Sequence, residues 1–401
     1  MIYVHVPFCR SFCTYCGFYS EICSRKEPQQ VQNRFFEDYA DAVCEEAAAR
    51  RAEISAARKG LDTLYIGGGT PSVLPVEVLA RIVRALGPAT YEEFTVEVNP
   101  DDVAAGGAPY AAALRGLGAN RVSMGVQSFD DGILRWMNRR HDAAGAREAF
   151  RLLRAAGFDN ISIDLIFGLS HLSDSVLEST VREAVALRPE HISAYQLSIE
   201  EGSVLEKMVA EGRYAEAPDE QCRRQYDILC RMLSKAGYVH YEISNWALPG
   251  REAVHNSAYW RRVPYVGLGP SAHSFSLSVT SGPAAGSDPS APCGVRSWNS
   301  EELARRDATG SMLRWHSESE ILSQREAAEE TIMLALRTAA GLPMALLRTL
   351  SPDAPVDDLL ADGSLCIVPS TSPAAPDPLI RIPEDHFFVS DSIIARLFPE
   401  E

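Results

Sequence analysis

The chain has 401 residues, a formal net charge of −16 and 46% hydrophobic residues. This length suits one large domain plus a small one, and the acidic balance argues against a nucleic-acid partner, which would need clustered basic residues. The N-terminus has no basic segment followed by an apolar run, and no stretch of about 18 apolar residues occurs, so we expect no signal peptide and no transmembrane segment.

The first 245 residues repeat one pattern, in which a short β-branched run is followed by an amphipathic helix. Apolar residues on one helical face precede Gly87 and Gly157, where a glycine suits the left-handed position after a helix. Alternating strands and helices predict a parallel sheet. The predicted strands span residues 2–6, 62–66, 93–98, 121–124, 160–166, 191–197 and 240–243.

Polar or glycine residues occur where most of these strands end, at 67–69, 97–99, Gln127, Asp164 and 196–198. A parallel barrel builds its site from the carboxyl ends of many strands, whereas a doubly wound sheet uses one switch point. We therefore predict an α/β fold with a partial parallel β/α barrel of about six strands. Any single one of these residues could instead simply begin a solvated loop.

The composition changes after residue 277. Residues 278–294 are rich in Ser, Pro, Gly and Ala and predict a surface insertion. A helical period returns from Glu318 and includes residues 342–350. It is followed by β-like runs at 365–368 and 379–382 and a last segment at 390–398. We predict a barrel at 1–245, a connecting region with a variable loop at 246–310, and a small α+β winged-helix-like domain at 311–401. The last domain has no basic recognition helix for DNA.

Three of the nine cysteines, Cys9, Cys13 and Cys16, lie in the loop after the first predicted strand, with the spacing C-x3-C-x2-C. Zinc prefers paired C-x2-C ligands, and a redox C-x-x-C pair would leave Cys9 unused. An iron–sulfur cluster fits best, because three thiolates on four irons leave one iron open to a substrate. The other cysteines are scattered, which favours reduced thiols in the cytoplasm.

The cysteine spacing, with Tyr15 before the third cysteine, resembles the radical S-adenosylmethionine (SAM) superfamily. The sequence GGGTP at 67–71, which alone would predict a tight turn, matches its methionine-binding motif. The stretches YVHVPFC, GGGTPS, VEVNP, RVSMGVQSF, MNRRH and SIDLIFGL are similar to the oxygen-independent coproporphyrinogen dehydrogenase group and to its relatives, the HemW heme chaperones. The resemblance implies a [4Fe–4S] cluster whose open iron is chelated by SAM.

By motif position, the resemblance implies a set of SAM contacts. Arg139 could pair with a carboxylate, although its neighbour Arg140 is an alternative, and Glu97 could accept from an ammonium group. Gln127 and Asp164 suit ribose hydroxyls, and a carboxylate in the apolar SIDLIFGL stretch should have a partner. The full set is Tyr3, Tyr15 (against the adenine), Gly68, Gly69, Thr70, Glu97, Gln127, Arg139, Asp164 and Ser198.

Two departures separate the chain from the coproporphyrinogen dehydrogenases. Their pattern continues with a fourth cysteine, linked to oxidative decarboxylation, where this chain has Phe18. HNSAYW at 255–260 matches an HNxxYW motif that the resemblance links to heme. His255 could serve as an axial ligand, and the aromatic residues of the motif could lie on a porphyrin. The alternatives are a hydrogen-bonded structural histidine, and His273 as the heme ligand.

The resemblance therefore predicts a cytoplasmic heme chaperone that carries a [4Fe–4S] cluster, SAM and heme as cargo. It would deliver heme to respiratory apo-proteins at the membrane, so it could associate peripherally with the inner membrane. No catalytic residue is assigned. The alternatives are an oxygen-independent coproporphyrinogen III oxidase and a radical enzyme acting on an unrelated substrate.

Overall fold

The computed structural model describes residues 1–23, 29–278, 293–369 and 377–399. Its main element is a nine-stranded sheet with the order β11-β1-β4-β5-β6-β7-β8-β10-β9. Its six central strands run parallel, which confirms the predicted partial barrel. These strands are β1 (Ile2–Val6), β4 (Thr63–Gly68), β5 (Glu93–Val98), β6 (Arg121–Gln127), β7 (Ile161–Phe167) and β8 (His191–Gln196).

The two ends of this sheet differ from one another. β11 (Val266–Leu268) adds to β1 in parallel, so the chain returns to its first strand after the barrel. At the other edge β10 (Asn245–Ala247) and β9 (Val239–Glu242) are antiparallel. The seventh predicted strand is therefore an antiparallel edge strand.

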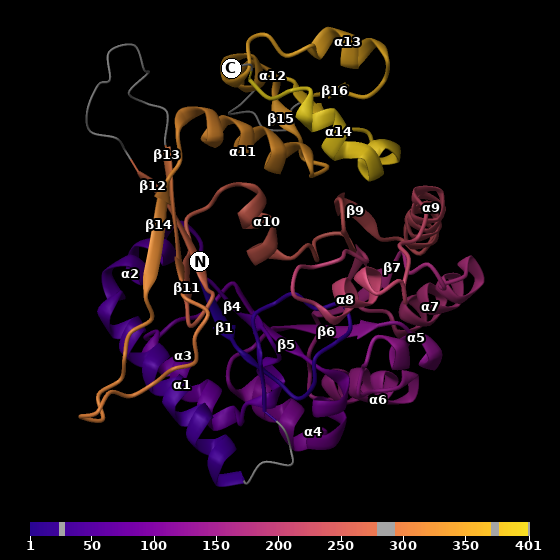
Figure 1. Cartoon of the computed structure of the whole chain (residues 1–401). Helices are drawn as coiled ribbons and strands as arrows, with labels where there is room; N and C mark the ends of the chain where they lie inside the picture. Colours follow the sequence, from indigo (N-terminus) through magenta and orange to yellow (C-terminus); the bar gives the residue numbers. More distant parts are fainter. Residues whose placement is uncertain (24–28, 279–292, 370–376, 400–401) are drawn as a thin grey trace.

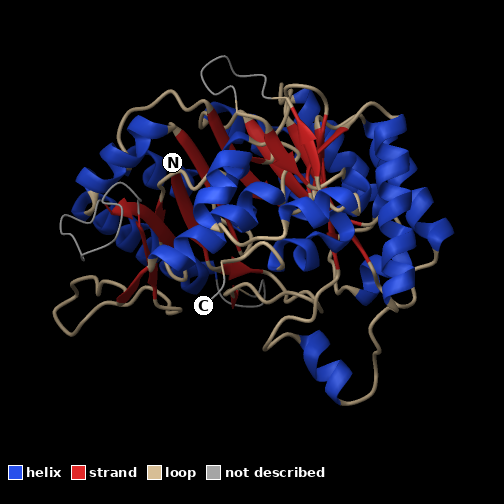
Figure 2. Ribbon diagram, turned by 90° about the horizontal axis from the view of Figure 1, so that it is seen from above, coloured by secondary structure: helices blue, strands red, loops and turns tan. Residues whose placement is uncertain are grey.

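Helices flank the strands, as Figure 2 shows in blue against red. The apolar face predicted before Gly87 belongs to α3, where Leu79 and Ile82 are fully buried, and Gly87 has a φ of +89°. The prediction before Gly157 is confirmed in the same way by α6. The helices are α1 (Gln29–Ala49), α2 (Arg51–Gly60), α3 (Val76–Ala85), α4 (Pro100–Gly116), α5 (Asp131–Trp136), α6 (Ala143–Ala155), α7 (Asp174–Leu187), α8 (Val204–Ala210) and α9 (Asp219–Lys235).

The connecting region contributes a short helix, α10 (Val254–Trp260), and an antiparallel sheet in the order β12-β13-β14. Its strands are β12 (His273–Ser278), β13 (Cys293–Asn299) and β14 (Ser317–Ile321). The predicted domain boundary at residue 310 falls between β13 and β14, inside this sheet. Most of the predicted insertion at 278–294 lies outside the described residues.

The C-terminal part begins with a helix, a strand, two helices and two strands, as in a winged-helix fold, and ends with η2 and α14. β15, β17 and β16 form a separate antiparallel sheet. Helix was predicted through residues 342–350, but the first two residues form β15 because Leu342 pairs with Ile380. The elements are α11 (Gln324–Leu336), β15 (Leu342–Pro343), α12 (Met344–Leu350), α13 (Val356–Ala361), β16 (Cys366–Val368), β17 (Leu379–Arg381), η2 (Glu384–Val389) and α14 (Ser390–Ala395).

This C-terminal part lies next to α10 and β9, at the top of Figure 1. Backbone hydrogen bonds join it to the barrel: Ile243 N–H donates to the Arg337 carbonyl at 3.1 Å, and Ala339 N–H to the Tyr241 carbonyl at 2.9 Å. Among the described residues, no helix has the length and apolar character needed to cross a membrane.

Candidate functional site

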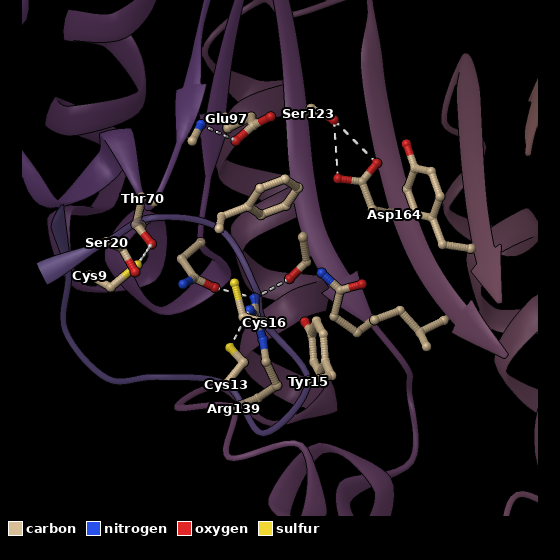
Figure 3. Close-up of a pocket in the computed structure, with 18 of the residues that line it drawn as sticks. Cys9, Cys13, Tyr15, Cys16, Ser20, Thr70, Glu97, Ser123, Arg139 and Asp164 are labelled. Atoms are coloured by element: carbon tan, nitrogen blue, oxygen red, sulfur yellow. Dashed lines mark hydrogen bonds between the residues drawn. The ribbon is translucent and has the colours of Figure 1, made fainter. Parts of the chain in front are cut away.

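A cavity of about 540 Å³ opens where the parallel strands end (Figure 3). Twelve of the fourteen site residues predicted from the sequence line it, so segments from positions 9 to 198 come together here. The two that do not line it are Tyr3 and His255. The twelve are Cys9, Cys13, Tyr15, Cys16, Gly68, Gly69, Thr70, Glu97, Gln127, Arg139, Asp164 and Ser198.

The cysteine loop is fixed by contacts from segments far along the chain. Thr14 N–H donates to the Met137 carbonyl at 3.1 Å, and its hydroxyl donates to the Trp136 carbonyl at 2.8 Å. Leu205 N–H at the start of α8 donates to the Thr14 carbonyl at 2.8 Å. Cys23 N–H closes the loop by donating to the Cys9 carbonyl at 2.8 Å.

The sulfur atoms of Cys9, Cys13 and Cys16 do not all lie within 4.8 Å of one another, so they are not gathered around a single ion position. Across the described parts of the chain, only Cys230, His240 and Glu384 bring three possible ligand atoms within 4.8 Å of one another. The loop cysteines nevertheless face one cavity, with Cys9 beside Thr70 and Cys13 and Cys16 beside Arg139 (Figure 3). This spread fits a multi-iron cluster, whose irons are ligated by separate thiolates.

Two glycines bring the backbone after β4 against the cysteine loop. Gly68 has a φ of +105°, and a Cβ there would lie 2.6 Å from the His5 ring. A Cβ on Gly69 would lie 2.8 Å from the Phe8 carbonyl oxygen, whereas its N–H donates to the Val6 carbonyl at 2.8 Å. Only glycine fits this approach. The following Thr70 hydroxyl is 3.3 Å from the Cys9 sulfur.

The two adjacent arginines have different surroundings. Arg140 is paired with Asp101 and Asp102 of α4 at 2.7 and 3.0 Å. Arg139 lies in the cavity, where it donates to the Cys13 sulfur at 3.3 Å and to the Asn99 side chain. No described carboxylate lies within 4.0 Å of Arg139, and its Nε is buried without a partner. A ligand carboxylate would satisfy this cation.

Glu97 offers a carboxylate on the opposite side of the cavity. Tyr65 O–H donates to it at 2.7 Å and Gly68 N–H at 3.1 Å. Burial raises the pKa of Glu97 to about 7, although the Tyr65 hydrogen bond opposes the rise. A ligand ammonium group would favour the charged form of this carboxylate.

Asp164 lies in an apolar stretch of sequence, from which we predicted a polar partner, and the structure places hydrogen-bonding groups beside it. Ser123 O–H lies 3.2 Å from both carboxylate oxygens (Figure 3), and Ser162 O–H is 3.5 Å from one of them. Burial raises the pKa of this carboxyl group. The sequence reasoning missed Ser123 and Tyr195 as lining residues; Tyr195 lies near the end of β8, whereas Ser123 lies inside β6, where no strand-end rule would find it.

Phe18 stands at the lip of the cavity, and 71% of its surface is exposed. Its neighbour Gly17 packs so closely on the β8–α8 loop that a Cβ would lie 2.6 Å from the Cβ of Glu200. The position at which the related oxidases carry a cysteine therefore holds an apolar ring facing solvent.

Tyr3 and His255 lie in the barrel beside the cavity. The Tyr3 hydroxyl is 3.1 Å from His5 Nδ1. His255 has no exposed surface, and its Nδ1 and Nε2 lie 2.8 Å from the Thr63 hydroxyl and 2.9 Å from the Tyr259 hydroxyl. Both ring nitrogens are therefore used inside the protein. Asn256, the next residue of the HNxxYW motif, does line the cavity.

Residues 3–184 match the model of the radical SAM superfamily. The chain is 35% identical to the heme chaperone HemW of Bacillus subtilis over 278 residues, which cover 68% of this chain and 70% of that protein. It is 34% identical to HemW of Mycobacterium tuberculosis, with 70% of each chain covered.

Among solved structures, the coproporphyrinogen III oxidase HemN of Escherichia coli superposes with a TM-score of 0.71 at 20% identity, covering 99% of this chain and 89% of the other. That likeness concerns the fold, whereas the sequence matches define the family. The chain belongs to the radical SAM superfamily and, within it, to the family of the HemW heme chaperones.

Proposed function

We propose that the protein is a heme chaperone that binds a [4Fe–4S] cluster and SAM, carries heme as cargo and delivers it to respiratory apo-proteins. The observation that carries this proposal is Phe18. It replaces the fourth cysteine of the related oxidases in a cavity where the rest of the predicted cluster and SAM residues are gathered. The identity to HemW proteins supports the same conclusion.

Different cavity residues would bind different parts of SAM. Arg139 would pair with its carboxylate and Glu97 with its ammonium group, while Cys9, Cys13 and Cys16 hold the cluster. Such a cluster, when bound, offers an open iron to the amino and carboxylate groups of SAM. Asp164 and Gln127 lie further along the cavity wall, where they would bind ribose hydroxyls, and Tyr15 would lie against the adenine.

Two histidines, His255 and His273, are the candidates for the axial ligand of heme. His255 uses both ring nitrogens internally, so coordination of heme by His255 would break its hydrogen bond to Thr63 or to Tyr259. His273 is exposed and stacks on Trp298, with ring centroids 5.9 Å apart. Replacing each histidine by alanine and recording the Soret band of added heme identifies which of them is the ligand.

The test of function is anaerobic and uses the reconstituted protein with SAM and a strong reductant. A chaperone binds heme and converts no coproporphyrinogen under these conditions. Transfer of heme to a heme-free respiratory enzyme, followed by recovery of its activity, tests delivery. A single turnover of coproporphyrinogen to protoporphyrinogen would replace this proposal with the oxidase, the function of the HemN protein whose fold is shared.

A further inference from the structure

A second cluster of metal-binding side chains lies far along the chain from the cysteine loop. Cys230 of α9, His240 of β9 and Glu384 of η2 bring one sulfur, one nitrogen and one oxygen within 4.8 Å of one another. His240 Nδ1 lies 3.1 Å from Glu384 Oε1 and 4.0 Å from Cys230 Sγ. We propose that these three side chains bind a zinc ion that joins the barrel to the C-terminal domain.

The contacts of His240 direct its Nε2 towards Tyr226 and its Nδ1 towards Glu384 and Cys230. Tyr226 O–H donates its single proton to the Ile243 carbonyl at 2.9 Å. Towards His240 Nε2, at 3.3 Å, the same oxygen can only accept, so Nε2 carries the proton. Nδ1 is then the nitrogen that faces Glu384 and Cys230, and a bound ion would take the place of the proton in the Nδ1–Glu384 hydrogen bond. A hydrogen-bonded outer nitrogen is the usual arrangement of a metal-binding histidine.

The ring is also held in place before any ion arrives. His240 stacks on Trp246 with centroids 4.1 Å apart and an interplanar angle of 11°, and Phe387 packs edge-on at 5.0 Å. Trp246 is fully buried, so this wall is rigid. A ligand whose rotamer is already fixed loses little conformational entropy on binding.

The set of donors matches zinc. Cysteine, histidine and carboxylate are its usual ligands, and three protein ligands leave the fourth tetrahedral position for water. The Glu384 side chain is 55% exposed, which gives the ion and this water a path from solvent. A thiolate and a carboxylate balance the charge of a dication.

The placement gives the ion a structural role. Cys230 comes from α9 and His240 from β9, the edge strand of the large sheet, whereas Glu384 lies more than a hundred residues later, beyond β17. An ion bound by all three side chains would hold the C-terminal domain against the barrel that contains the cavity. The competing explanation is a simple hydrogen bond between His240 and Glu384, in which the cysteine has no part.

The experiment measures zinc and iron together on the full-length protein with its cluster reconstituted. After anaerobic dialysis against micromolar zinc chloride and desalting, we expect the wild type to hold about one zinc per chain more than the Cys230→Ser variant. Iron content should be equal in both. Cys222→Ser is the matched control, because Cys222 is a buried cysteine of the same helix outside the cluster.

Two further measurements keep the proposal testable if Cys230→Ser folds poorly. The exposed Glu384→Gln substitution should leave the fold intact and weaken zinc binding about 10-fold or more. X-ray absorption at the zinc edge should show a sulfur ligand at about 2.3 Å. Equal zinc content in wild type and Cys230→Ser, or a zinc signal without sulfur, would overturn the proposal in favour of the His240–Glu384 hydrogen bond.

Discussion

Replacing Arg139 by alanine should weaken SAM binding while leaving the fold intact. The guanidinium lies in the cavity with no described carboxylate within 4.0 Å, so a bound ligand would supply its counter-charge. Loss of one partner of a hydrogen-bonded charge pair costs about 2–5 kcal/mol. Because Arg139 is only partly buried, we take the lower end, about 2 kcal/mol, which corresponds to roughly 30-fold in affinity.

Calorimetry on the reconstituted protein under anaerobic conditions measures this change. Arg139 also donates to the Cys13 sulfur at 3.3 Å, so iron content must be determined in parallel to separate loss of SAM binding from loss of the cluster. Arg140→Ala is the matched control, because Arg140 is already paired with Asp101 and Asp102 outside this role. Unchanged affinity in iron-loaded Arg139→Ala, together with weaker binding in Arg140→Ala, would refute the assignment.

Three further predictions concern the same cavity. Cys13→Ser should abolish the brown chromophore and the SAM-sensitive EPR signal, whereas Cys23→Ser should keep both; loss of the cluster in both would mean a different ligand set. Because the pKa of Glu97 is about 7, SAM affinity measured between about pH 6 and 8 should fall with falling pH, by at most about tenfold per unit, and Glu97→Gln should lose this dependence. Gly69→Ala should lower iron content, because its Cβ would lie 2.8 Å from a loop carbonyl, whereas Gly116→Ala, which meets no atom within 4 Å, should not.

The strand positions were predictable because each strand is determined by the pattern of neighbouring residues in the sequence. β-branched runs separated by amphipathic helices gave the parallel strands within a few residues, and the glycines after α3 and α6 gave two helix ends. The cavity was predictable for the same reason, since polar residues at parallel strand ends must meet. A local sequence pattern does not show in which direction a strand runs in the sheet, so the antiparallel pairing of β9 and β10 was not predicted.

The surroundings of individual side chains depend on contacts that sequence spacing does not show. The partner of His255 Nδ1 is Thr63, 192 residues earlier, and nothing near either residue indicates the pair. Glu93 is a similar case, because its carboxylate accepts from the N–H groups of Val254 and His255 at 2.8 and 3.0 Å and so fixes the start of α10. A histidine read from a motif as a ligand thus lies in a polar network inside the barrel.

The cysteine loop shows how fold and cluster depend on each other. In a small zinc domain the metal itself supplies the folding free energy. Here the loop is positioned by hydrogen bonds of Thr14 to Met137, Trp136 and Leu205, which belong to segments that meet only when the sheet has formed. Each such bond contributes about 1 kcal/mol, and none requires a metal. The barrel contacts therefore position the loop, so a cluster held by its three cysteines would occupy a site that is already formed beside the strand ends.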